Sequence, residues 1–591
     1  MANKHASLDA LFADIADAIR EKTGDTGTIP TAEFPSMIRE RLEVIPPLPY
    51  LTFNSPSSFT LAVNDATKHW DGTLEYSINT SVWTAWDGTT TISSATSGSN
   101  NVLYLRGTGN TVITGNNINY KWVLTGSNIK CIGNIENLLD YATVESGAHP
   151  TMATSCYRRM FRGCESLTQA PTLPATTLAD DCYRGMFQDC TSLTKAPNLP
   201  ATTLANNCYR SMFQDCTSLT QAPALPATTL ANNCYRGMFQ DCTSLTKAPD
   251  LPATTLVNDC YHSMFYSCTS LTQVPTLPAT TLAANCYYDM FGNCASLTQA
   301  PNLPATTLAN NCYRGMFYVC TSLTQAPALP ATTLADDCYH SMFYNCTSLT
   351  QVPALPATTL ANNCYDSMFQ ECTRLTQVPA LPATTLANYC YNSMFRGCTS
   401  LTQAPTLPAT TLANYCYNYM FSGCTALTQA PALPATTLAS SCYQFIFRNC
   451  TSLTQVPSLP ATTLVDYCYY GMFSGCTSLT QAPALPAMTL AANCYYSMFD
   501  GCTSLTQAPA LPATTLKVYC YAFIFRGCTS LKLSSTQTGE YTIAYRIPTT
   551  GTGTTAMSAL TDMFISTGGT FTGTPEINTT YYLSNTNTVV D

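Results

Sequence analysis

Thirty of the 31 cysteines stand in one register, and no other feature restricts the fold of this 591-residue chain as strongly. From Cys156 to Cys520, fifteen cysteines follow one another at intervals of 26 residues, and each has a second cysteine eight residues later. Only Cys131 lies outside the pattern. A fixed period of this length with recurring Leu indicates supersecondary units stacked into a solenoid.

One unit, which starts at Cys208, reads CYRSMFQDCTSLTQAPALPATTLANN. Its apolar residues at offsets 0, 1, 4, 5 and 8 predict a short helix, with Asn206 and Asn207 as N-caps. Pro223 and Pro226 exclude a helix from the second half, which we expect to be extended. Each coil is therefore predicted to be a short strand plus a short helix, with the strands of neighbouring coils side by side.

The pattern F-x-x-C-x-S-L-T, followed by Leu-Pro and a returning Leu, resembles the leucine-rich repeats of the BspA type, also called Treponema-type, from about residue 150 to 532. The resemblance implies an α/β solenoid. The chain departs from the family pattern in its extra Pro and in Ala or Val, such as Ala222 and Val274, where a bulky strand residue is usual.

We predict five parts: a helical segment at 1–43, a β-sandwich domain at 44–127, a cap at 128–155, the leucine-rich-repeat solenoid at 156–532 and a second cap at 533–591. The first rests on the helical spacing of Leu8, Leu11, Phe12, Ile15 and Ile19. The sandwich rests on short alternating apolar runs between turn residues. Residues 558–565 repeat the Met-Phe pair of the coils and predict a truncated last repeat.

The string ADIADAIREKTGDTGTIPTAEFPSMI resembles N-terminal segments of tail-fibre proteins of phages and prophages in gut bacteria. It implies that residues 1–43 bind tail or baseplate proteins, or join copies of the chain into a homo-oligomer. Residues 1–30 hold no unbroken apolar segment of the signal-peptide kind. We therefore expect a virion (tail) protein made in the host cytoplasm without a signal peptide, with the bacterial cell surface as the alternative location.

The paired cysteines have three interpretations. A disulfide between helical positions eight apart is excluded, because the Cα atoms would lie about 12 Å apart. A disulfide ladder between coils and a metal site stay open, although the spacing and the five His do not favour a metal. We favour small buried thiols stacked from coil to coil. This structural thiol ladder includes Cys182, Cys190, Cys208, Cys216, Cys234 and Cys242.

The copies differ mainly beside the first cysteine and on the outer side of the predicted helix. Relaxed constraint on a wet surface explains this variation, but the residues are rich in Tyr and Arg, which are enriched at binding hot spots. We expect the strand side to be uniform and any selectivity to lie here. The candidate recognition residues are Arg158, Arg184, Arg210, Arg236, His262, Tyr288, Arg314, His340, Tyr389, Tyr415, Tyr467, Tyr470, Tyr496 and Tyr519.

Composition argues against several classes of function. The chain is 10% charged, carries a net charge of −9 and has no basic patch, so we expect no nucleic-acid partner. It has no apolar run long enough for membrane insertion. Gly551, Gly553 and Ala556 match G-x-G-x-x-A, but only 35 residues follow, too few for a dinucleotide-binding domain. We expect no cofactor and no enzymatic activity.

The sequence thus predicts a non-enzymatic recognition protein, most specifically a bacteriophage or prophage tail fibre that contacts a bacterial surface receptor, either protein or glycan. Two alternatives stay open, a BspA-like adhesin of the bacterial cell surface and a fibre spacer with no ligand.

Overall fold

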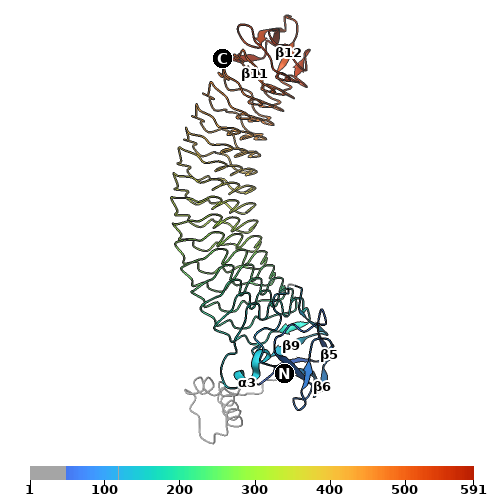
Figure 1. Ribbon diagram of the computed structural model, residues 1–591. Helices are drawn as coiled ribbons and strands as arrows, with labels where there is room; N and C mark the ends of the chain where they lie inside the picture. The colour runs from blue at the N-terminus through green and yellow to red at the C-terminus, as the bar shows by residue number, and fades with distance from the viewer. Residues whose placement is uncertain (1–47, 118) are drawn as a thin grey trace, which may run out of the picture.

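The computed structural model describes residues 48–117 and 119–591, and it shows a curved stack of coils with β-rich regions at both ends (Figure 1). One continuous apolar core runs from Leu51 to Leu583. The predicted helical segment at 1–43 lies outside the described residues.

Two β-sheets form the N-terminal region. The larger has the order β10-β9-β1-β7-β3-β4, with β6 also paired to β7, and the smaller has the order β5-β2-β8. The strands are β1 (Leu51–Ser55), β2 (Thr60–Val63), β3 (Thr73–Ser77), β4 (Thr84–Trp86), β5 (Ile92–Ser93), β6 (Ala95–Ser97), β7 (Asn100–Thr108), β8 (Trp122–Thr125), β9 (Ile129–Ile132) and β10 (Leu167–Gln169). Because β9 and β10 belong to the larger sheet, that sheet continues across the boundaries predicted after residues 127 and 155.

The first coil is closed by both sheets and by the segment that follows them. Trp122 N–H donates to the Met160 carbonyl at 2.7 Å, and the Tyr157 hydroxyl donates to the Ile135 carbonyl at 3.2 Å. Trp122 also packs its ring 6.0 Å from Phe161. Helix α3 (Asn137–Glu145) lies in the segment predicted as a cap, and its backbone is kinked at Asp140.

The predicted short helix in each coil is wrong. From the residue before the first cysteine to the residue before the second, each coil is a run of overlapping turns, which we call the turn segment. Within the described residues, α3 is the only helix. Only the local backbone conformation differs from the prediction, since the apolar residues that predicted a helix are all buried.

The turn segment divides its N–H groups between two kinds of acceptor. Alternate residues donate back to a carbonyl three residues earlier, and the residues between them donate to the next coil. In one coil the second group has five members, and three of them, Tyr209, Ser211 and Phe213, bond over 2.8–3.0 Å to the carbonyls of Cys234, Arg236 and Met238. Every coil is thereby tied to the next through its backbone, which an α-helix, with its bonds closed internally, does not allow.

A strict period of four residues explains this conformation. Every fourth residue of the turn segment has a positive φ, as Asn207 (55°), Ser211 (52°) and Asp215 (60°) do. Asn, Asp, Ser and Gly dominate these positions along the stack, and they include the residues that best tolerate left-handed backbone. Asn207 is thus part of the turn run and not the helix N-cap that its sequence position predicts.

The extended segment of each coil forms less sheet than predicted. Along the stack, the extended segments form named strands only near the two ends, as β10 in the first coil and β11 (Gln507–Pro509) near the last. The coils between them make isolated parallel bridges, such as Lys195 with Gln221 and Thr203 with Thr229. Two Pro per segment lack the N–H that a continuous ladder needs.

Identical side chains stack along the core in columns, one column for each equivalent position. The Tyr column runs from Tyr157 to Tyr521, with ring centroids 5.5–5.9 Å apart and ring planes within 11° of parallel. The Phe column runs beside it from Phe161 to Phe525 and is extended by Phe564 at 5.5 Å. These columns and those of Cys, Met and Leu are fully buried or nearly so.

The C-terminal region completes the stack with an imitation of one more coil. Phe525 N–H donates to the Met563 carbonyl at 3.1 Å, so residues 558–565 occupy the place of a last turn segment. A sheet of order β13-β15-β12-β14 and the parallel pair β11-β16 follow. These strands are β12 (Lys532–Ser534), β13 (Tyr541–Arg546), β14 (Gly568–Gly569), β15 (Thr580–Ser584) and β16 (Thr588–Val590).

All 31 cysteines lie among the described residues, buried and unbridged, and these include the six of the predicted thiol ladder. The second cysteine of each coil has a specific partner: the Cys216 thiol donates to the Phe187 carbonyl at 3.1 Å, and the same bond recurs from Cys190 to Cys528. Burial raises the pKa of the Cys182 and Cys320 thiols to about 12. The second cysteine is therefore a hydrogen-bond donor as well as a core residue.

Outward side chains of one coil lie over the next coil, where glycine makes room for them. A Cβ atom at Gly471 would overlap the ring of Phe445, and one at Gly315 would overlap the carboxylate of Asp289. The sizes of residues at equivalent positions of neighbouring coils are therefore coupled, because a large side chain in one coil requires a glycine in the next.

We predict that Gly471→Ser destabilises the protein by about 1–3 kcal/mol more than Gly237→Ser in urea unfolding, because only the first introduces a clash. Both glycines have a φ near +60°, but a Cβ at Gly237 meets nothing nearer than 3.3 Å. Adding Phe445→Ser should restore most of the loss. Equal effects of the two single substitutions would contradict the coupling.

We also predict that stability falls steeply as the pH rises above about 8.5, the ordinary pKa of a cysteine thiol. The unfolded chain loses thiol protons there, while the folded chain keeps them until its raised pKa is reached, so the folded state becomes relatively less stable. Denaturant midpoints measured from pH 7 to 10 test this. A midpoint that does not change with pH, or thiols that react with a dye in the native protein at pH 8, would contradict the burial.

Candidate recognition surface

The outward side chains of the turn segments form one face of the stack, here called the turn face. Counting from the first cysteine of each coil, its columns are −1, +2, +3, +6 and +7. All fourteen candidate recognition residues fall in columns −1 and +2. The structure brings these two columns together, since the Tyr467 and Tyr470 rings lie 5.9 Å apart. Most of the fourteen are half-buried, and Tyr389, Tyr467 and Tyr519 are 36–40% exposed.

The N-terminal half of these two columns carries ion pairs, and we call it the basic zone: Arg158, Arg184, Arg210, Arg236, His262, Tyr288, Arg314 and His340. Arg184 pairs with Asp181 of its own coil at 2.9 Å, whereas Arg314 pairs with Asp337 of the next coil at 3.0 Å. Burial and the neighbouring arginines lower the pKa of Arg210 to about 10. Much of the charge in this zone is therefore satisfied within the protein.

Two histidines of the basic zone are packed into the same network. The His262 ring stacks on Tyr288 at 4.5 Å, and its Nδ1 lies 3.2 Å from an Asp259 oxygen. Burial, followed by the charge of Arg236, lowers the pKa of His262 to about 4. Burial also lowers the pKa of His340 and raises that of its neighbour Asp366. His262 is therefore uncharged at neutral pH and suits a packing role.

The C-terminal half of the turn face differs. We call its aromatic residues in columns −1, +2 and +3 the aromatic zone: Tyr389, Tyr415, Tyr419, Phe445, Tyr467, Tyr470, Tyr496, Tyr519 and Phe523. Consecutive rings from Tyr419 to Phe523 lie 4.7–5.3 Å apart, so they form a continuous strip. Arginine guanidinium groups of column +6 lie 5.1–5.4 Å from three of these rings.

Backbone conformation sets the aromatic zone apart. Seven of its nine residues have φ between 53° and 59°, at columns where most coils carry Asn, Asp, Ser or Gly; these are Tyr389, Tyr415, Tyr419, Phe445, Tyr467, Tyr519 and Phe523. A bulky residue in this conformation costs on the order of 1–3 kcal/mol. Relaxed constraint does not explain such residues, because drift would favour the less strained ones.

Sequence reasoning missed three residues of this zone, Tyr419, Phe445 and Phe523 in column +3. It also missed the arginines beside them in column +6, Arg396, Arg448 and Arg526. Column +3 is otherwise mostly Ser or Gly. Three aromatic residues in such a column were a visible signal, but the expected helix gave no reason to treat it as special.

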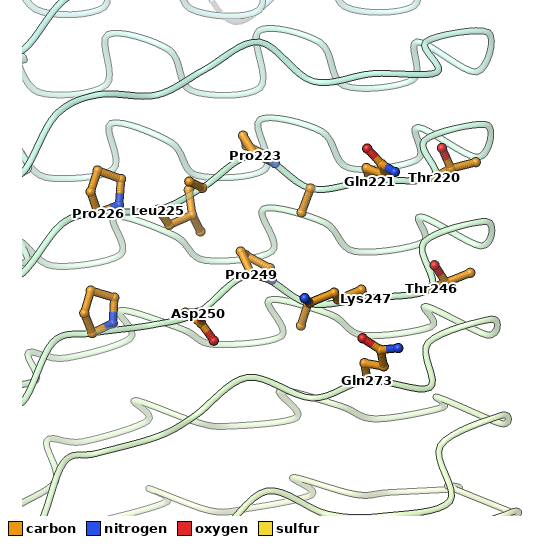
Figure 2. Close-up of a pocket in the computed structure, with 14 residues that line it drawn as sticks. Thr220, Gln221, Pro223, Leu225, Pro226, Thr246, Lys247, Pro249, Asp250 and Gln273 are labelled. Atoms are coloured by element: carbon orange, nitrogen blue, oxygen red, sulfur yellow. The ribbon is translucent and has the colours of Figure 1, made fainter. Parts of the chain in front are cut away.

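The opposite, extended face carries open grooves between neighbouring coils. Figure 2 shows one of them, where Thr220 and Gln221 of one coil lie beside Thr246 and Lys247 of the next. Grooves at equivalent places are lined by residues 168–200 and 402–434. Their Thr and Pro positions hardly change between coils. One lining position alternates between Gln and Lys, and another varies among small residues such as Asn198, Ala224 and Asp250, so this face varies less than the turn face.

Two absences hold for the part of the chain that the structure describes. No group of three His, Cys, Asp or Glu side chains there is placed to hold a metal ion. None of its helices is long and apolar enough to cross a membrane.

Comparison with known proteins decides the family. The model of the BspA type leucine-rich repeat region matches residues 136–272, 232–376, 314–428 and 388–532, which together span more than half of the chain. The chain belongs to the BspA-type leucine-rich repeat family. Repeats of this type indicate a protein of surface recognition or adhesion.

A solved structure of a leucine-rich repeat protein from Eubacterium ventriosum ATCC 27560 is similar at 16% identity and a TM-score of 0.30. The alignment covers 56% of this chain and 82% of that protein. No curated protein matches the chain.

We predict that Tyr467→Asn stabilises the protein by about 1 kcal/mol, because Asn relieves the strain of a tyrosine at a φ of 59°. Asn occupies the equivalent position in several coils, such as Asn493. Urea unfolding measures the change, with Tyr470→Asn as the control, since Tyr470 is not among the residues of positive φ. Loss of stability in Tyr467→Asn alone would contradict the strain argument.

Proposed function

We propose that this chain is a non-enzymatic recognition protein whose turn face contacts a bacterial surface receptor, either protein or glycan. The main support is that constant and variable positions are separated within each coil. The core columns are nearly constant and the extended face varies at two positions, while the turn face changes from ion pairs to aromatic residues along the stack.

The stack is suited to this role because the residues that stabilise it differ from those that face a partner. Backbone bonds between coils and buried columns hold it together, so outward side chains can vary without loss of the fold. Many weak contacts along a rigid surface add to a strong one.

The location we propose is the tail of a bacteriophage or prophage, with residues 1–43 as the anchor to tail or baseplate proteins and as the site of homo-oligomer formation. The support is the resemblance of that segment to tail-fibre proteins. The alternative is an adhesin on the bacterial cell surface, which the repeat family favours. Immunogold electron microscopy with an antibody to the coils separates the two, since it labels either particle tails or cell envelopes.

The function is tested by binding of the labelled full-length protein to intact gut bacteria. A turn-face variant combines Arg184→Asn, Arg236→Asn, Tyr470→Asn and Tyr496→Asn, which introduce the residue found at Asn392 and Asn418 of the same column. We expect it to lose at least tenfold in apparent affinity while its thermal midpoint stays within a few degrees.

An extended-face variant, with Gln325→Ala, Gln351→Ala and Gln429→Ala, is the matched control and should bind like the unchanged protein. Loss of binding in this control alone would move recognition to the extended face. If the unchanged protein binds no strain of a broad panel, the chain is a structural spacer and the proposal fails.

A further inference from the structure

The aromatic zone differs from the basic zone in having few ion pairs within the protein. Three of its tyrosines, Tyr389, Tyr467 and Tyr519, are exposed. Exposed apolar residues gathered on one face mark an interaction site.

Backbone strain shows that these side chains are not a product of drift. Tyr419, Phe445 and Phe523 stand at positive φ in a column where six coils carry Ser and four carry Gly. A sequence under no constraint but folding would carry the smaller residues. Bulky residues at strained positions suggest a function that requires them.

Two pairs of rings in the zone are stacked face to face. In Tyr389–Tyr415 and Tyr470–Tyr496 the ring planes are within 5° of parallel at 4.6 and 4.7 Å. Each ring thus covers one face of its neighbour, and the outward edges of such a stack carry the positive part of the ring quadrupole.

Two arginines add positive charge beside the rings. Arg396 lies 5.4 Å from the Tyr419 ring and Arg448 lies 5.1 Å from the Phe445 ring. Both are exposed, and no carboxylate among the described residues pairs with either. Arg526, over Phe523, is paired with Asp500 through its Nε at 2.8 Å. Beside the zone there are therefore two guanidinium groups that contact rings but have no carboxylate partner among the described residues, in a chain whose net charge is −9.

A protein partner fits this surface better than a sugar. Saccharide rings bind on an open aromatic face, and in each of the two stacked pairs one face of every ring is covered by the other ring. Apolar side chains pack against ring edges, carboxylates bind guanidinium groups, and Tyr and Arg dominate protein hot spots.

We propose that the aromatic zone binds an acidic protein segment, whose Asp or Glu side chains pair with Arg396 and Arg448 while its apolar side chains pack on the ring strip. This proposal rests on the proposed recognition role of the turn face and names the chemistry of the partner.

The test measures binding of the full-length protein to immobilised twelve-residue peptides that alternate Glu with Leu or Phe. Matched peptides carry Lys in place of Glu, and a third surface carries chito-hexaose, a neutral saccharide. Two of the variants use residues from equivalent columns of this chain: the zone variant is Tyr419→Ser with Phe445→Ser and Phe523→Ser, and the arginine variant is Arg396→Gln with Arg448→Gln. The control is the extended-face variant, whose three substituted Gln residues lie outside the turn face.

We expect the Glu peptides to bind at least ten times more tightly than the Lys peptides, and more weakly as salt is added. The zone variant should lose at least tenfold without a fall in thermal midpoint, the arginine variant should lose the preference for Glu, and the control should change less than twofold. Equal binding of Lys peptides, preferential binding of chito-hexaose, or an unchanged zone variant would overturn the proposal.

Cell binding separates this inference from the proposed function. If the zone variant binds bacteria like the unchanged protein while the turn-face variant does not, the acidic partner is wrong and recognition by the turn face stands. If the unchanged protein binds neither cells nor peptides, both fail.

Discussion

Backbone hydrogen bonds between consecutive turn segments are the constraint on which the rest of the structure depends. In a turn segment such as 207–215, five of the nine N–H groups find their acceptor in the next coil. A single coil would leave these groups unsatisfied and its Tyr and Phe rings uncovered. The fold therefore needs repeats in strict register and a partner for the coil at each end of the stack. The N-terminal sheets supply one partner, which donates to the Met160 carbonyl, and residues 558–565 supply the other, which accepts from the Phe525 N–H.

The same constraint determines where the sequence can vary. Core positions must repeat, because each ring stacks on its own copies, and every fourth residue must accept a positive φ. What remains is the turn face, and even there the coils are not independent, as Phe445 over Gly471 shows. The aromatic zone is unusual because it accepts strain at permissive positions, which we relate to binding.

The period, the burial of the Cys, Tyr, Met and Phe columns, and the imitation coil at 558–565 could be predicted from the sequence, because repetition makes them visible. The helix could not be excluded, since offsets 0, 1, 4, 5 and 8 fit both an α-helix and a four-residue turn. The distinguishing signal was the Asn, Asp, Ser and Gly at columns −1, +3 and +7, such as Asn207 and Ser211. The continuation of the sheet into β9 and β10 depends on contacts that no local pattern records.

Residue-by-residue NMR of the turn segments tests the account most directly, through backbone chemical shifts and the coupling between the amide and Hα protons, which report φ. The account predicts positive φ at every fourth residue, with Ser263, Ser341 and Ser393 as representatives. Uninterrupted helical values from the first to the second cysteine of a coil would contradict it, because such coils could not bond to one another in this way.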